Sequence, residues 1–268
     1  MLVLICALAP LRAMASDAPS PSRLAAELAR DRQLVVRAEA TWAAVAARPP
    51  PAQAMDAAVL TTQQQARGFA FRQAIWNEQA LIYQLAGDPT LAAQVLPAVG
   101  AGADPGLATA VPGLGDAWQL SGITLPATVQ PVQDRAYTDS EPVANLLGYY
   151  RSAASAYGIG WGYLAAINFI ETDFGRNDGP SSAGAQGPMQ FLPSTWAEYG
   201  SGSIMSEHDS IWAAARLLTA DGAPDDYASA VFDYDNDQDY VRAVLGLAQA
   251  MDADPLWLDR LYYWNTYG

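Results

Sequence analysis

The chain has 268 residues, with 14 arginines and no lysine against 28 acidic residues, so its formal net charge is −14. Such an acidic chain repels a phosphate backbone, which argues against nucleic-acid binding. With 51% hydrophobic residues, one cysteine and one histidine, we expect a packed core without a disulfide framework, a thiolate metal cluster or a multi-histidine metal site.

The N-terminal segment carries the pattern of an export signal. Residues 2–9 form an apolar run that is too short to span a membrane, and Ala13-Met14-Ala15 follows it. This pattern predicts a signal peptide over residues 1–15 and an extracytoplasmic protein, secreted or in the cell envelope. The usual basic residues before the apolar run are missing, and the alternative is an ordinary frayed N-terminus.

A small helical module is expected over residues 22–96. Apolar residues at helical spacing predict helices over 22–48 and about 52–85, and Asp88-Pro89 predicts the cap and first turn of a third helix ending near Leu96. Packing or spacing is the expected role, and docking of a cell-wall protein partner is the alternative. Glycines and prolines recur from residue 97 to 140 without any period, which predicts a linker there.

Short helical segments return from residue 141 to the end. Caps, prolines and glycines predict helices over 143–157, 161–172, 193–199, 209–220, 226–232 and 237–251. The fold class is therefore mainly α, with one turn region rich in glycine and serine over residues 175–187.

Glu171 is the first candidate for chemistry. It shares a helix face with Leu164 and Ile167, and burial on such a face raises a carboxyl pKa toward the range that a general acid needs. The alternative is a glutamate at a helix end that reaches solvent. The following loop, residues 175–196, offers small, hydroxyl, amide and aromatic side chains, a mixture that suits a glycan. Neither a phosphate-binding pattern nor metal-ligand spacing is present, so no cofactor or metal is expected.

The string Gly184-Ala185-Gln186-Gly187-Pro188-Met189-Gln190-Phe191, continuing to Trp196, together with Ile170–Arg176, resembles lytic transglycosylases. The likeness is to the membrane-bound transglycosylase B-like and soluble lytic transglycosylase-like enzymes of actinobacterial type, and it covers residues 141–268. It implies a lysozyme-like catalytic domain that cleaves the β-1,4 bond from N-acetylmuramic acid to N-acetylglucosamine in peptidoglycan strands and forms a 1,6-anhydro ring. Glu171 would be the general acid and then the base. The matching substrate-binding positions are Ser181, Gln186, Met189, Gln190, Phe191 and Tyr234, with Met189, Gln190 and Phe191 on the cleft floor and the Tyr234 hydroxyl orienting Glu171.

Asp235 departs from this pattern, because the relatives carry asparagine there. It places a negative charge near Glu171 or supplies the second carboxylate of a hydrolase, and the alternative is that it caps a helix. Two further functions therefore stay open: a muramidase that uses Glu171 and Asp235, and an inactive peptidoglycan-binding module. His208 is expected at the surface, and Asp233–Asp239 as a solvated acidic turn.

Overall fold

The computed structural model describes residues 19–46, 54–100, 102–120, 140–177 and 179–263, so the predicted signal peptide lies outside the described residues. Within these ranges the chain forms eleven α-helices and no strand beyond an isolated antiparallel bridge between Gln186 and Phe191. The predicted mainly α class is confirmed. None of the helices in the described ranges combines the length and apolar character that crossing a bilayer requires.

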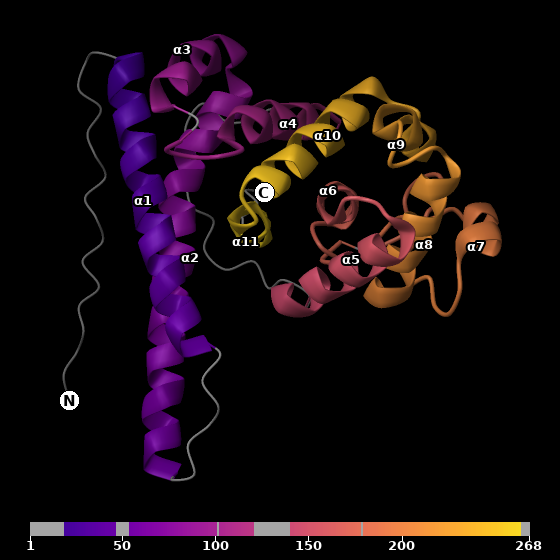
Figure 1. Ribbon diagram of the computed structural model, residues 1–268, viewed down its shortest axis with the longest axis horizontal. Helices are drawn as coiled ribbons and strands as arrows, with labels where there is room; N and C mark the ends of the chain where they lie inside the picture. Colours follow the sequence, from indigo (N-terminus) through magenta and orange to yellow (C-terminus); the bar gives the residue numbers. More distant parts are fainter. Residues whose placement is uncertain (1–18, 47–53, 101, 121–139, 178, 264–268) are drawn as a thin grey trace.

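The first two helices, α1 (Pro21–Ala46) and α2 (Ala54–Gly87), form a long antiparallel hairpin beside the rest of the molecule (Figure 1). Val35, Phe71 and Ile75 fill a small core between them. Helix α3 (Pro89–Val99) follows, and the Asp88 side chain caps it by accepting a hydrogen bond from the Leu91 N–H, as predicted.

The predicted linker is wrong over residues 107–120, which form helix α4 (Leu107–Leu120) packed against α10. Pro112 and two glycines on α4 read as helix breakers, but here they permit close packing. A Cβ on Gly246 of α10 would lie 2.7 Å from the Thr109 carbonyl oxygen, and one on Gly113 would lie 3.2 Å from the Ala243 carbonyl oxygen. Glycine is therefore required at this crossing because the two backbones nearly touch. Residues 121–139 of the predicted linker lie outside the described residues.

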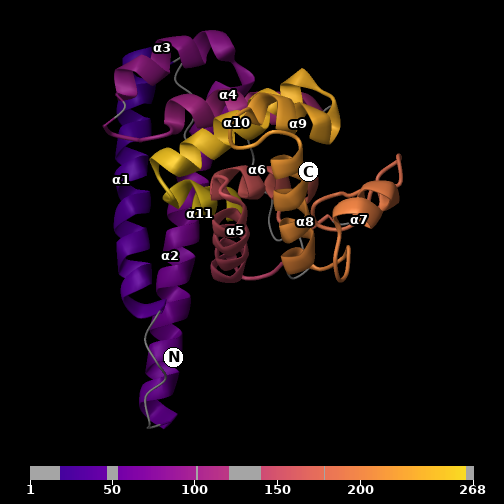
Figure 2. The ribbon, with the colours of Figure 1, turned by 45° about the vertical axis from the view of Figure 1, so that its right-hand side comes forward.

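Seven helices form the C-terminal body: α5 (Val143–Tyr157), α6 (Trp161–Thr172), α7 (Pro193–Tyr199), α8 (Glu207–Ala220), α9 (Tyr227–Asp235), α10 (Gln238–Ala253) and α11 (Leu256–Tyr262). The predicted bounds of α5, α6 and α7 are confirmed. Helix α8 starts two residues before the prediction, and the Ser206 side chain caps it by accepting from the Asp209 N–H. Helix α6 is buried along its length and contacts α5, α8 and α10 (Figure 2).

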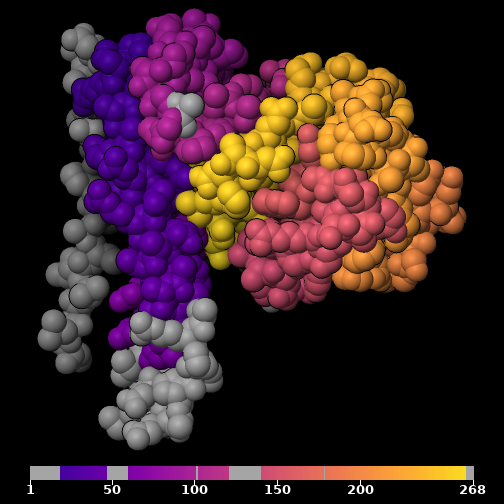
Figure 3. All heavy atoms as spheres, in the orientation of Figure 1, coloured from indigo at the N-terminus to yellow at the C-terminus, as the bar shows by residue number. Residues whose placement is uncertain are grey.

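The N-terminal helices and the C-terminal body share one continuous core, and α10 and α11 form the side of the body that faces the N-terminal helices (Figure 3). An ion cluster, defined as Arg32, Glu78, Asp104, Asp254 and Arg260, adds to this contact. The fully buried Arg260 guanidinium lies 3.0 Å from both Asp104 carboxylate oxygens, and its Nε lies 2.9 Å from Glu78 Oε2. Arg32 pairs with Asp104 at 3.5 Å and with Asp254. Because buried charges require such partners, α1, α2 and α11 are held together.

Candidate active site

Glu171 lies on the last turn of α6, just before a sharp reversal of the chain. Three successive residues, Asp173, Phe174 and Gly175, have φ values of 52°, 59° and 78° in the left-handed region. An Asp173–Arg176 ion pair of 3.1 Å holds this turn, and Arg176 also donates to the Tyr262 carbonyl oxygen at 2.9 Å. A Cβ on Gly175 would overlap the Glu207 carboxylate. The turn ends the helix immediately after the candidate acid, where its carboxyl group reaches the edge of the core.

The Glu171 carboxyl group is partly buried and has one hydroxyl partner. The Tyr240 hydroxyl, on the first turn of α10, donates to Oε1 at 2.6 Å. The Glu171 pKa is raised to about 7, mainly by burial; the Tyr240 hydrogen bond opposes this rise and the nearby Asp235 charge adds to it. Burial also raises the pKa of Tyr240 well above its usual value, so this phenol stays protonated as a donor. Glu171 can therefore hold a proton near neutral pH and release it to a bound substrate.

The prediction that the Tyr234 hydroxyl orients Glu171 is wrong. Tyr234 instead donates to the Met189 carbonyl oxygen at 2.7 Å, and its ring stacks on Tyr240 with centroids 6.2 Å apart and planes 11° apart. Tyr234 thus supports both the partner of the acid and the adjacent loop. The sequence places Tyr240 within the resemblance but does not pair it with Glu171, because the two residues are 69 positions apart and meet only when α6 packs on α10.

The loop after α6 is fastened to the helix that carries the acid. The Pro188 carbonyl oxygen accepts from Asn168 Nδ2 at 2.9 Å and from the Thr172 hydroxyl at 2.6 Å, and both side chains are buried. The Tyr150 hydroxyl in turn donates to Asn168 Oδ1 at 2.5 Å. Since buried polar groups are costly when unpaired, these bonds fix the loop at one position relative to Glu171.

The predicted substrate-binding residues separate into exposed and buried groups. Ser181 is exposed, and its oxygen accepts from the Ala183 and Ala185 N–H groups at 3.2 and 3.1 Å, which leaves the O–H proton for a ligand. Gln186 and Gln190 are partly exposed; the first forms the bridge to Phe191, and the second donates to the Gly187 carbonyl oxygen at 2.9 Å.

Met189 and Phe191 do not line a cleft floor with their side chains, so that prediction is wrong. Met189 is fully buried and Phe191 is 2% exposed. Phe191 packs edge-on against the Tyr234 ring, with centroids 5.9 Å apart. An apolar residue in a motif can serve either the ligand or the core, and here the loop turns both side chains inward. Their backbone remains useful, because the Met189 carbonyl group anchors Tyr234.

Asp235 is exposed at the last position of α9. It does not cap a helix: Asp237 caps α10 by accepting from the Asp239 and Tyr240 N–H groups at 2.6 and 3.4 Å. Its charge adds to the raised Glu171 pKa, whereas partial burial and the charge of Asp237 raise its own pKa. His208 is exposed, and its Nδ1 lies 2.9 Å from Asp209 Oδ1, so the predicted surface position is confirmed.

The site therefore unites a carboxyl group that is half-protonated near pH 7, a phenol that holds it, and a rigid loop with hydroxyl and amide groups. Such a site can deliver a proton to a leaving oxygen and then accept one from a nearby hydroxyl group. Comparisons of the chain with protein families, with curated proteins and with solved structures gave no match.

Proposed function

We propose that the chain is an exported peptidoglycan lytic transglycosylase that cleaves the bond from N-acetylmuramic acid to N-acetylglucosamine. The observation that carries the proposal is Glu171, a carboxyl group with a pKa of about 7 beside the Tyr240 hydroxyl. The loop beside it, residues 181–196, has the sequence that resembles these enzymes.

One carboxyl group suffices for both steps of this reaction. Protonated Glu171 donates its proton to the glycosidic oxygen, the bond from C1 of the muramic acid to that oxygen breaks, and the N-acetylglucosamine leaves with a free hydroxyl group. The Glu171 carboxylate then takes the proton of the C6 hydroxyl while O6 attacks C1, which closes the anhydro ring and restores the protonated acid. Tyr240 stabilises the carboxylate between the two steps through its hydrogen bond of 2.6 Å.

Recognition has to rest on uncharged groups. The net charge of −14 gives no attraction to a strand that bears carboxylates of its own. The exposed hydroxyl of Ser181 and the partly exposed amides of Gln186 and Gln190 offer hydrogen bonds to sugar hydroxyl and acetamide groups.

A muramidase that uses Glu171 and Asp235 is the second candidate. The observation that favours it is the charge of Asp235, which is close enough to raise the Glu171 pKa. Because Asp235 is exposed, water can reach it, and a hydrolytic enzyme needs water at its second carboxylate.

Product analysis separates the candidates. Purified sacculi are digested with the native chain, and the released fragments are examined by mass spectrometry. Anhydro ends are the expected result. Reducing ends without anhydro ends would identify a muramidase, and sacculus binding without released fragments would identify an inactive binding module.

Three variants sharpen this assay. Glu171→Gln should abolish release of fragments, and activity that survives it would refute the assignment of the acid. Asp235→Asn should keep anhydro products in a transglycosylase but lose turnover in a muramidase. Glu198→Gln removes an exposed carboxylate from α7 and serves as the matched control, with activity unchanged.

A further inference from the structure

A partly exposed aromatic side chain lies at the start of α6, at the end of the helix opposite to the acid. Trp161 is partly exposed and lies between Gly160 and Gly162. A Cβ on Gly160 would lie 2.9 Å from Tyr163 Cδ2, and one on Gly162 would lie 3.0 Å from the Ala248 carbonyl oxygen. The backbone on both sides of Trp161 is therefore tightly packed.

A second contact strengthens this fixation. The Gly160 N–H donates to the Tyr227 hydroxyl at 2.6 Å, and the Tyr227 ring stacks on Tyr163 at 3.6 Å between centroids with planes 3° apart. The backbone that carries Trp161 is thus fixed, so a ligand that binds the indole has to order only the torsions of this side chain.

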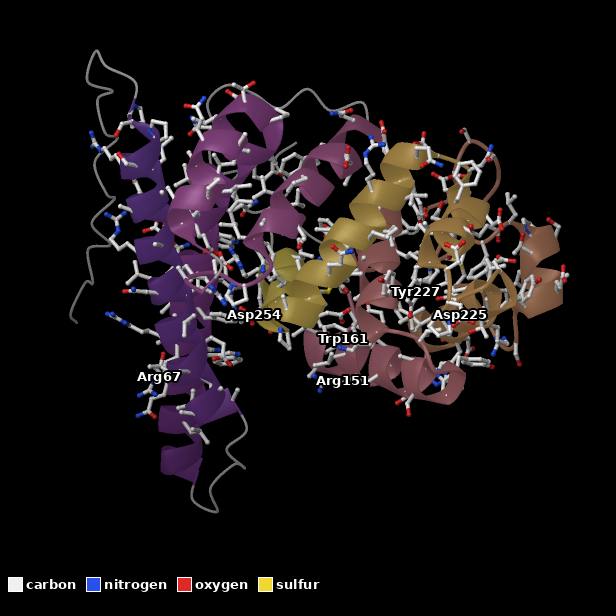
Figure 4. The ribbon with its side chains drawn as sticks, turned by 45° about the horizontal axis from the view of Figure 1, so that its top comes forward. Arg67, Arg151, Trp161, Asp225, Tyr227 and Asp254 are labelled. Atoms are coloured by element: carbon white, nitrogen blue, oxygen red, sulfur yellow. The ribbon has the colours of Figure 1, made fainter. Side chains whose placement is uncertain are left out.

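The guanidinium of Arg151, on α5, lies over this indole at 5.8 Å from the ring centroid (Figure 4). Between residues 101 and 268 the chain has 6 arginines against 21 acidic residues. Arg151 is exposed, yet it pairs with no carboxylate among the described residues. The other arginines described between 102 and 263 pair with carboxylates or with a backbone carbonyl group: Arg176, Arg216, Arg242 and Arg260. Among the arginines described between residues 102 and 263, Arg151 is therefore the one without a carboxylate or carbonyl partner, and it lies beside a partly exposed indole.

Trp161 and Glu171 occupy opposite ends of the same helix. Ten residues separate them, which corresponds to about 15 Å along the axis at 1.5 Å per residue. The two residues are therefore close enough for a single polymer strand to contact both.

We propose that Arg151 and Trp161 form a second binding site for the peptidoglycan strand, remote from the bond that is cleaved. The indole stacks on a sugar ring, and the guanidinium binds the carboxylate of a muramic acid arm. This proposal rests on the proposed function, because that function supplies the ligand. The positive charge of Arg151 would attract an anionic strand that the acidic protein otherwise repels.

The test is equilibrium binding of the purified full chain to sacculi, with Glu171→Gln present throughout so that the strands stay intact. Trp161→Ala and Arg151→Gln should each weaken binding about five- to tenfold, which is the range for stacking and charge-assisted contacts. Trp161→Tyr should retain most of the affinity. Arg67→Gln removes another exposed arginine, on α2, and should leave binding unchanged (Figure 4).

Chitin oligosaccharides separate the two roles, since they have the sugar rings without the carboxylates. Trp161→Ala should weaken their binding, whereas Arg151→Gln should not. Unchanged sacculus binding in both variants would overturn the proposal, and so would an equal loss in Arg67→Gln, which would indicate a net-charge effect. Failure of the proposed function has a different readout: the native chain would release no fragments even though binding depended on Trp161.

Discussion

Replacing Tyr240 with phenylalanine should move the alkaline limb of the pH–activity profile to higher pH. In the native chain the 2.6 Å hydrogen bond from Tyr240 to Glu171 Oε1 lowers the pKa of that carboxyl group, and the substitution removes this bond. A hydrogen bond to a charged group contributes about 1.5–3 kcal/mol, and 1.36 kcal/mol corresponds to one pKa unit. The Glu171 pKa, about 7 in the native chain, should therefore rise by about one unit or more.

The measurement is kcat/KM on a soluble glycan strand between pH 5 and 9, because this parameter reports the pKa values of the free enzyme. The native limb should fall with a midpoint near pH 7, and the Tyr240→Phe limb near pH 8. Absolute activity should decrease as well, since the carboxyl group loses its orientation, but only the limb position tests the electrostatic reasoning.

Asp235→Asn supplies the opposite perturbation. It removes the charge that adds to the raised Glu171 pKa, so the limb should move to lower pH, by less than one unit because Asp235 is exposed. The native limb should also shift to lower pH in high salt, whereas that of Asp235→Asn should not.

For Tyr240→Phe, a limb that stays at the native position or moves to lower pH would refute the electrostatic reasoning.

Three further predictions concern stability. Glu171→Gln should raise the melting temperature at pH 8, because a partly buried carboxylate is removed, and a lower value would contradict the burial argument. In the part of the chain that the structure describes, four carboxyl groups have pKa values raised to about 7 by burial: Glu78, Glu171, Asp173 and Asp259. The folded chain retains their protons while the unfolded chain releases them above about pH 4.5, so stability to urea should fall as the pH rises from about 4.5 to 7 and stay lower above it, and a flat profile would refute this. Arg260→Met leaves the buried Asp104 carboxylate short of a partner and should cost about 3–5 kcal/mol in urea unfolding, whereas Arg242→Met on the exposed pair with Asp116 should cost under about 1 kcal/mol; equal losses would count against the ion cluster.

The helices that the sequence predicts well are those with local signals at both ends. Pro193 and Gly200 bracket α7, and Gly158 ends α5 in the left-handed conformation. Helix α4 has the opposite character, because Pro112 and its glycines are locally unfavourable and are stabilised only by contact with α10. Such a helix depends on tertiary packing, which no local pattern records.

The residues of the candidate site also differ in whether local sequence or tertiary packing determines their positions. Glu171 can be identified from the sequence because Leu164 and Ile167, seven and four positions earlier on the same helix, place it on an apolar face. The partner Tyr240 is not, since its approach depends on how two distant helices pack. Met189 and Phe191 show the converse limit: a motif gives their position in the loop but not whether they face the ligand or the core.

Helix α10 carries Tyr240 on its first turn and meets α4 two turns later, where Gly246 nearly touches Thr109. Glu171 is therefore held by an element that also packs against α4, which lies outside residues 141–268. A chain shortened to residues 141–268 would expose the side of α10 that packs against α4, and Tyr240 would lose part of the packing that holds its helix. The position of the Tyr240 hydroxyl beside Glu171 therefore depends on a helix outside the part of the chain that contains both residues.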